Sequence, residues 1–166
     1  MSSPRPVTVV SLTIATVKPG SGKKPKKTTG LVLHFSGALN PTQAKSLAEF
    51  HLLSGKVKKG HTTYSKPMPL SSAIYDPTAH TISLVPKGKL NLAQPEQLRI
   101  TASLLTDSLG RPIDGNHDGQ PGGDYVANLS KNKVTPLAVP RTTAAAVDAA
   151  LQQMSVTTSP ILRRRR

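Results

Sequence analysis

The residue types best suited to chemistry lie close together in the segment 114–124, which has the sequence DGNHDGQPGGD. Asp114, Asn116 and Asp118 stand at every second position, and a glycine and Gln120 follow them. This spacing matches the first half of a calcium loop of the type D-x-[DN]-x-[DN]-G. Short Asp and Asn side chains spaced in this way can converge on one Ca²⁺ ion, which takes about six to eight oxygen ligands, while glycine permits the sharp turn.

The second half of this segment departs from the EF-hand pattern. Tyr125 stands at the twelfth position, where an EF-hand has a bidentate Glu. Asp124 lies one place earlier and could replace that ligand through a different path of the loop, and Asp107 is a further carboxylate at the start of the same stretch. Gln120 would contribute its backbone carbonyl. The predicted calcium ligands are therefore Asp107, Asp114, Asn116, Asp118, Gln120 and Asp124.

A loop without metal is the alternative interpretation of the same residues. Asp and Asn side chains accept hydrogen bonds from nearby backbone N–H groups in Asx turns, and these turns need no ion. His117 is expected to point into solvent under either interpretation, so no zinc role is predicted for it. The sequence leaves calcium binding and a plain Asx-turn loop both open.

The charge distribution indicates a second kind of site. The chain has 22 Lys and Arg against 8 Asp and Glu, a formal net charge of +14. Its basic residues gather in segments 18–27, 56–59 and 163–166, which have the composition of loops or tails. Such runs could attract nucleic acid or another polyanion without sequence specificity, because no aromatic platform for stacking accompanies them. The predicted polyanion-binding residues are Lys23, Lys24, Lys26, Lys27, Lys56, Lys58, Lys59, Arg163, Arg164, Arg165 and Arg166.

Other chemistry finds no support in the residue pattern. The chain has no cysteine, which excludes thiolate nucleophiles, disulfides and Cys-based zinc sites. Segment 19–24 resembles a phosphate-binding loop only superficially, because the G-x4-G-K-[ST] spacing fails. The five histidines are scattered without metal-ligand spacing, and no G-x-S-x-G motif marks a nucleophile. We therefore expect a protein that is not an enzyme and has no small-molecule substrate.

Period-two alternation predicts the strands that would position these segments. Val10, Leu12 and Ile14 form an apolar row within a strand over 7–18. The other predicted strands are 31–36, 50–54, 71–75, 80–85, 97–104 and 125–129, with the turn 76–78 between two of them and a ragged hairpin over 55–69.

One short helix is predicted between the second and third of these strands. Asn40 is suited to be its N-cap, Pro41 its first residue and Gln43 its capping-box partner, so that one or two turns would cover 41–49.

About seven short strands with a single helix favour an all-β sandwich over a βαβ architecture. The sandwich is expected over residues 7–130, with a flexible N-terminus 1–6, a basic loop 19–30 and an Asp/Gly-rich loop 106–124. Residues 131–166 are expected to form a peripheral extension with a helix over 143–154 and a disordered Arg tail. No transmembrane segment is predicted, because no apolar run approaches about 18 residues.

Several motifs between residues 31 and 129 resemble bacterial Ig-like domains of S-layer and other surface proteins, especially planctomycete-type modules. The matching motifs are LHFSGALNP (33–41), LAEF (47–50), AIYDP (73–77), ISLVP (82–86) and DSLGRPIDGN (107–116). The last of these, continued by GGDYV (122–126), is the most specific. The resemblance covers the larger part of the chain.

This resemblance implies an Ig-like sandwich at or outside the cell surface. It implies a non-catalytic structural or adhesive module, whose partners would be neighbouring modules of a larger surface protein or an extracellular polymer. Calcium in the 114–124 loop would stabilise such a module. No signal peptide is predicted at the N-terminus, so the chain is expected to be exported only as a piece of a larger protein. The alternative is a basic protein that binds polyanions through its Lys- and Arg-rich segments.

Overall fold

The computed structural model describes residues 4–19, 26–131 and 133–137, and this part of the chain forms nine strands. One helical turn, α1 (Pro41–Ala44), and one 3-10 turn, η1 (Ala102–Leu104), lie in the connections. The strands are β1 (Val9–Val17), β2 (Thr28–Phe35), β3 (Phe50–Lys58), β4 (His61–Met68), β5 (Leu70–Asp76), β6 (Thr81–Pro86), β7 (Glu96–Ile100), β8 (Tyr125–Ser130) and β9 (Lys133–Leu137).

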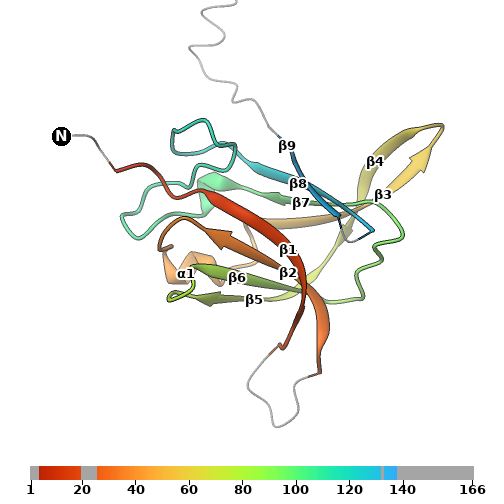
Figure 1. The fold of residues 1–166 in the computed structure, drawn as a ribbon, viewed down its shortest axis with the longest axis horizontal. Helices are drawn as coiled ribbons and strands as arrows, with labels where there is room; N and C mark the ends of the chain where they lie inside the picture. Colours follow the sequence, from red (N-terminus) through yellow and green to blue (C-terminus); the bar gives the residue numbers. More distant parts are fainter. Residues whose placement is uncertain (1–3, 20–25, 132, 138–166) are drawn as a thin grey trace, which may run out of the picture.

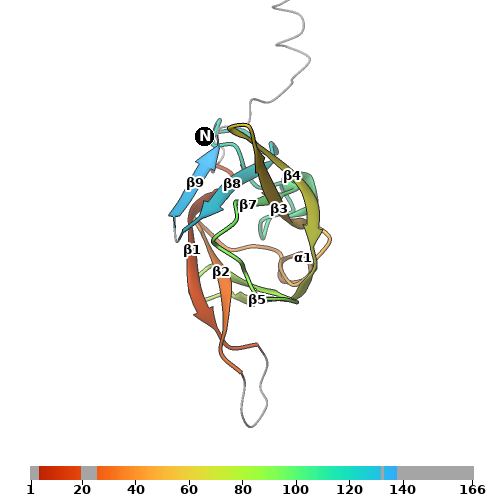
Figure 2. The same ribbon diagram turned by 90° about the vertical axis from the view of Figure 1, so that its right-hand side faces the viewer.

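The strands form two antiparallel sheets that pack face to face (Figures 1 and 2). One sheet has the order β1-β2-β6-β5, and the other has the order β4-β3-β7-β8-β9. With the first eight strands lettered A, B, C, C′, D, E, F and G, the sheets are A-B-E-D and C′-C-F-G, which is the arrangement of an immunoglobulin-like sandwich. β9 extends the second sheet. The predicted fold class is confirmed, with nine strands in the described residues instead of about seven.

The core lies between the sheets and consists of the inward row of each strand. Alternate residues of β2, β6, β7 and β8 form apolar rows that are buried in the core. Their residues are Leu31, Leu33 and Phe35; Ile82 and Leu84; Leu98 and Ile100; and Tyr125, Ala127 and Leu129. Burying a Leu or Ile side chain contributes roughly 1.5–3 kcal/mol, so an aliphatic core of this size can hold two sheets together.

Strand β1 differs from its predicted pattern at Val10. Val9 and Leu12 are buried whereas Val10 is 65% exposed, so the predicted inward row is wrong at its first member. The register of β1 against β2 shifts between Val9 and Ser11. A bulge at this point adds one residue to β1 and reverses the alternation on its N-terminal side.

Helix α1 begins where the sequence predicts but ends after a single turn. Asn40 Oδ1 accepts a hydrogen bond from the Thr42 N–H at 3.0 Å, which confirms the N-cap. Gln43 does not complete a capping box. Its Oε1 accepts a hydrogen bond from the Thr106 N–H at 2.8 Å instead, so this side chain ties the β2–β3 connection to the β7–β8 connection.

Several element boundaries differ from the sequence prediction. β7 ends at Ile100 and η1 follows it, so the strand predicted over 97–104 is too long. Residues 55–68 of the predicted ragged hairpin form a hairpin of β3 and β4 with one bulge. β2 begins at Thr28, inside the predicted basic loop 19–30. β9 lies beyond the predicted end of the sandwich at residue 130 and pairs with β8 along its whole length.

Some predicted features lie outside the described residues. These are the helix over 143–154, the Arg tail and the first three residues of the N-terminus. Within residues 4–19, 26–131 and 133–137, no helix has the length and apolar character that crossing a membrane requires.

The two ends of the sandwich carry different structures (Figure 1). One end gathers the N-terminal segment, the β2–β3 connection with α1, and the β7–β8 connection. Isolated bridges join these three segments, from Leu39 to Asp107 and from Thr8 to Asp114. The β3–β4 hairpin projects from the opposite end.

Candidate functional site

The Asp/Gly-rich loop is anchored to the sandwich by both apolar and polar contacts. Leu105 and Ile113 are completely buried, and the Ile113 N–H donates to the Leu105 carbonyl at 3.0 Å. The Asn40 N–H donates to the Thr106 carbonyl at 2.9 Å, which fixes the loop to the segment before α1. The loop that carries the predicted calcium ligands is therefore a packed part of the domain.

Asp114 forms the centre of a turn. Its carboxylate is buried, with 1% of the residue exposed. Oδ1 accepts a hydrogen bond from the Asp118 N–H at 3.2 Å, and Oδ2 accepts one from the Gly119 N–H at 2.8 Å. These donors satisfy a buried negative group that would otherwise destabilise the fold.

Asp118 continues this turn toward solvent. Its Oδ1 accepts a hydrogen bond from the Gln120 N–H at 2.9 Å, and its Oδ2 accepts one from Asn116 Nδ2 at 3.1 Å. Asp114, Asn116, Asp118 and Gln120 thus lie within one turn, linked by hydrogen bonds of the Asx type.

Gly115 allows the two ends of this loop to meet. A Cβ atom at Gly115 would overlap the carbonyl oxygen of Gly123 and would lie 2.6 Å from the backbone nitrogen of Tyr125. The Gly115 N–H donates to the Gly122 carbonyl at 3.4 Å. Only glycine permits this approach of two backbone segments.

Asp124 is directed away from this turn. Its Oδ2 accepts a hydrogen bond from Arg99 Nε at 3.2 Å, and its Oδ1 accepts one from the Ala102 N–H at 3.3 Å. Both contacts lie at the end of β7 and the start of η1. The structure therefore places this predicted calcium ligand beside an arginine.

Asp107 is also engaged by an arginine. The Arg111 guanidinium lies 2.7 Å from Asp107 Oδ2 through its Nη2, and the N–H groups of Leu109 and Arg111 donate to Oδ1 at 2.9 and 3.0 Å. Burial by itself raises the pKa of this carboxyl, but the hydrogen bonds from Arg111 and Leu109 outweigh it and hold the pKa below its ordinary value. Asp107 is thus an ionised partner of Arg111 inside the loop.

The N-terminal segment is clamped against the same loop. Arg111 Nη1 donates to the Pro4 carbonyl at 2.6 Å, and the Asp114 N–H donates to the Val7 carbonyl at 2.8 Å. His117 Nε2 lies 2.6 Å from the Val9 carbonyl. We call these contacts the N-terminal clamp. A hollow of about 280 Å³ between the segment and the loop is bordered by Asp114 and His117.

His117 and Arg111 have roles that the sequence did not reveal. His117 is exposed as expected, but its ring contacts the Val9 carbonyl and meets the Tyr125 ring edge to face at 6.5 Å. The spacing of Asp107 and Arg111 at i and i+4 is visible in the sequence and could have predicted their pairing. Nothing in the sequence indicates the contact between Arg111 and Pro4.

The donor chemistry divides the six predicted calcium ligands into two groups. Asp114, Asn116, Asp118 and Gln120 lie in one turn and offer hard oxygens, and a carboxylate oxygen that accepts one N–H group has a further lone pair for a cation. Asp107 and Asp124 are turned to arginines. Among the described residues, no three His, Cys, Asp or Glu side chains form a group that could hold a metal ion.

The predicted polyanion-binding residues fall into separate places. Lys56 and Lys58 lie on β3 and Lys59 lies in the turn after it, so these three are on a strand and hairpin tip and not in a loop. Lys26 and Lys27 are exposed just before β2. The others, Lys23, Lys24, Arg163, Arg164, Arg165 and Arg166, lie outside the described residues.

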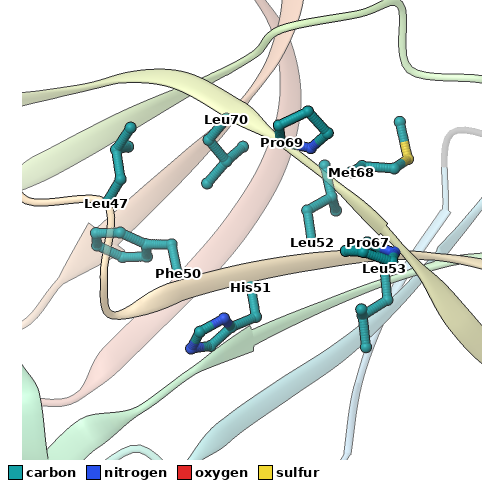
Figure 3. Close-up of a pocket in the computed structure, with 9 residues that line it drawn as sticks. All are labelled: Leu47, Phe50, His51, Leu52, Leu53, Pro67, Met68, Pro69 and Leu70. Carbon is teal, nitrogen blue, oxygen red and sulfur yellow. The ribbon is translucent and has the colours of Figure 1, made fainter.

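An apolar groove of about 370 Å³ opens between β3 and the passage from β4 to β5 (Figure 3). Phe50, Leu52, Met68 and Leu70 line it together with neighbouring residues of these strands. It is formed where the chain crosses from one sheet to the other at Pro69.

No protein-family model, curated protein or solved structure matches this chain. The resemblance to bacterial Ig-like surface-protein domains therefore stays a hypothesis based on the sequence motifs.

Proposed function

We propose that the protein is a non-catalytic structural or adhesive module of a cell-surface or extracellular protein. The N-terminal clamp carries this proposal. A chain segment that connects a module to its neighbour transmits load, and here that segment is held to the body by Arg111, Asp114 and His117. Neighbouring modules or an extracellular polymer would be its partners.

The structural roles of the carboxylates support a non-catalytic function. Asp107 and Asp124 pair with arginines, and Asp114 accepts two backbone N–H groups. Asp76 Oδ1 accepts the N–H groups of Thr78 and Ala79 in the β5–β6 turn. These acids each stabilise a local structure, which is the use expected of polar groups in a module selected for its shape.

Calcium binding belongs to this proposal in a narrower form. The ligands would be the carboxylates of Asp114 and Asp118, the Asn116 side chain and the Gln120 carbonyl, and the remaining positions would be filled by water. Bound calcium would neutralise two carboxylates and rigidify the loop that holds the N-terminal segment. A site with so few protein ligands has the low affinity typical of extracellular modules, with a Kd of about 0.1–1 mM.

Pulling single molecules apart by atomic force microscopy tests the structural role. The chain is held at both termini, and the unfolding force of Arg111→Lys is compared with that of the unchanged protein. Lysine keeps a positive charge beside Asp107 but loses the planar fork that also reaches the Pro4 carbonyl. We expect a lower unfolding force in the variant, with a loss of only about 1 kcal/mol in chemical stability.

Arg99→Lys is the matched control for this experiment. It makes the same change in an arginine–carboxylate pair that is far more exposed, with 50% of the Arg99 side chain accessible. Its unfolding force should equal that of the unchanged protein. Equal forces for Arg111→Lys and the unchanged protein, or a chain that extends without a distinct force peak, would contradict the proposed mechanical role.

A further inference from the structure

The β3–β4 hairpin extends beyond the sheet to which it belongs. β7 pairs with β3 only from Phe50 to Ser54, whereas β4 pairs with β3 as far as Lys58. Residues 56–63 therefore form a two-stranded ribbon beside which no third strand of the described residues lies, and every one of these residues is exposed. Figure 1 shows the ribbon projecting from the end of the sandwich opposite α1. Two-stranded ribbons are only marginally stable by themselves, so we expect a ribbon that projects from the domain to have a function of its own.

Local contacts nevertheless give this ribbon a defined shape. The turn consists of Lys59 and Gly60, both with positive φ (50° and 80°), which is the geometry of a tight two-residue hairpin. At the base, Tyr64 lies over Gly55, where a Cβ atom would be 2.8 Å from Tyr64 Cδ1. An aromatic ring over a strand glycine holds the two strands in register. The ribbon is thus a preformed protrusion.

The ribbon is basic and lacks neighbouring acids. Lys56, Lys58, Lys59 and Lys66 lie on it or at its base, and the sequence from residue 50 to residue 75 contains no Asp or Glu. The two salt bridges found in the described residues involve Arg99 and Arg111 only. The charges of the ribbon are therefore directed to solvent, and they attract an anionic partner.

We propose that the β3–β4 ribbon binds double-stranded DNA by inserting its tip into the major groove. The major groove of B-DNA is about 12 Å wide and 8.5 Å deep and admits a two-stranded β-ribbon. Two strands spaced about 4.8 Å apart, with side chains on both sides, fit within that width. Four residues of strand at about 3.3 Å each span about 13 Å, which exceeds the depth, so the tip of the ribbon can reach the floor of the groove. Lys56 and Lys58, which share one face of β3, and Lys59 at the tip then contact phosphates along the groove.

The convex shape favours duplex DNA over other polyanions. A protruding two-stranded ribbon fits a concave groove such as the major groove of a duplex. Single-stranded nucleic acid is bound through aromatic stacking, and Tyr64, the aromatic residue at the base of the ribbon, is occupied in covering Gly55. The major groove of duplex RNA is too narrow and deep for side chains to enter. DNA binding of this kind is independent of the structural role proposed above.

Fluorescence anisotropy with a labelled duplex of 20 base pairs tests this inference on the full chain. The variant Lys56→Gln/Lys58→Gln/Lys59→Gln removes the ribbon charges. The control Lys45→Gln/Lys87→Gln/Lys89→Gln removes three exposed lysines elsewhere, so both variants lose the same net charge. We expect the ribbon variant to lose roughly tenfold in affinity for each lysine that contacts a phosphate, with a shallower salt dependence, and the control to change little.

A duplex whose major groove is blocked tests whether the ribbon binds in that groove. A duplex whose cytosines carry glucose in the major groove should bind the unchanged protein roughly as weakly as the ribbon variant binds plain duplex. Equal losses in the two lysine variants would show attraction by the net charge of the whole molecule and would overturn the proposal. Stronger binding of heparin, duplex RNA or single strands than of duplex DNA, full binding of the glucosylated duplex, or absence of any binding would also overturn it. Thermal melting checks that both variants are folded.

Discussion

At the scale of single residues, several acidic side chains of this basic protein are buried. Glu49, Glu96, Asp107 and Asp114 are all buried. Asp107 is satisfied by Arg111, and because its pKa is lowered in the folded state, its contribution to stability is complete above the unfolded pKa and is lost as the pH falls through the folded pKa. Glu96 is the opposite case. Its Oε1 accepts the Asn91 N–H at 3.0 Å, and no donor among the described residues reaches Oε2.

Replacing Glu96 by Gln is expected to stabilise the protein at neutral pH. Burial raises the pKa of Glu96, and the hydrogen bond from Asn91 only partly offsets this. The folded state therefore holds the proton more tightly than the unfolded state, so the free energy of unfolding falls as the pH rises from the unfolded pKa through the folded pKa. Glu96→Gln removes that fall and should raise the free energy of unfolding by about 1 kcal/mol at pH 8. Urea unfolding between pH 4 and pH 8 measures it.

Asp76→Asn serves as the control for this pH series. It also removes one carboxylate, but Asp76 is on the surface and asparagine retains the Oδ1 that accepts the Thr78 N–H. Its stability should follow that of the unchanged protein over the series. A Glu96→Gln variant less stable than the unchanged protein at pH 8 would contradict the destabilising effect assigned to the buried carboxylate.

At the scale of elements, the β7–β8 connection organises one end of the sandwich. It contacts the segment before α1 through Thr106, and it contacts the N-terminal segment through Arg111 and Asp114. Its own turn closes around the Asp114 carboxylate. Because three separate chain segments meet on this loop, any ligand that orders the loop stabilises all three.

Calcium is expected to raise the melting temperature through this loop. With a Kd of about 0.1 mM, 10 mM calcium would add about 2.7 kcal/mol to the stability of the folded state. Asp118→Ala removes a proposed calcium ligand and should abolish the increase. Because Asp118 is exposed, this substitution leaves the core intact. Differential scanning calorimetry in EGTA and then in calcium measures the shift.

Two controls accompany the calcium measurement. Magnesium at the same concentration separates a specific site from ionic strength, because Mg²⁺ demands an octahedral set of ligands and gives up its water reluctantly. Asp76→Asn, a carboxylate change in the β5–β6 turn, should keep the full calcium response. Equal melting temperatures in EGTA and calcium would leave the hydrogen-bonded Asx turn as the complete description of the loop.

At the scale of the whole molecule, the burial of carboxylates increases the excess of positive charge on the surface. The formal net charge is +14, and the buried carboxylates cannot screen the exposed lysines as surface acids would. Like charges at the surface repel one another, which favours the expanded unfolded chain over the folded one. The same surplus attracts polyanions.

Added salt is expected to stabilise the protein. Raising sodium chloride from about 20 mM to about 200 mM shortens the Debye length to below about 10 Å and screens the repulsion between lysines. We expect the melting temperature to rise by about 3 °C, which corresponds to ~1 kcal/mol. Lys87→Glu/Lys89→Glu, which reduces the imbalance by four charges, should show a smaller rise. A melting temperature that falls with salt would mean that attractive pairs such as Asp107–Arg111 outweigh the repulsion.

The local sequence predicts those features whose cause is local. Alternation in β2, β6, β7 and β8 indicates the apolar row that faces the core, because side chains of a strand point alternately to its two faces. Asn40 predicts the start of α1, because its side chain needs only the N–H groups that follow it. The bulge at Val10 escapes this reasoning, because it is defined by the register of β1 against β2 and not by β1 alone.

The sequence by itself determined that this chain is an all-β sandwich with an aliphatic core, an excess of basic residues and an Asp-rich loop. Only the tertiary structure decided the partners of the polar residues. Asp107 and Asp124 are turned to arginines, and Arg111 reaches a carbonyl 107 positions away at Pro4. The reason is physical: burial follows from the period of a strand, whereas a hydrogen bond depends on which distant segments the packed sheets bring within about 3 Å.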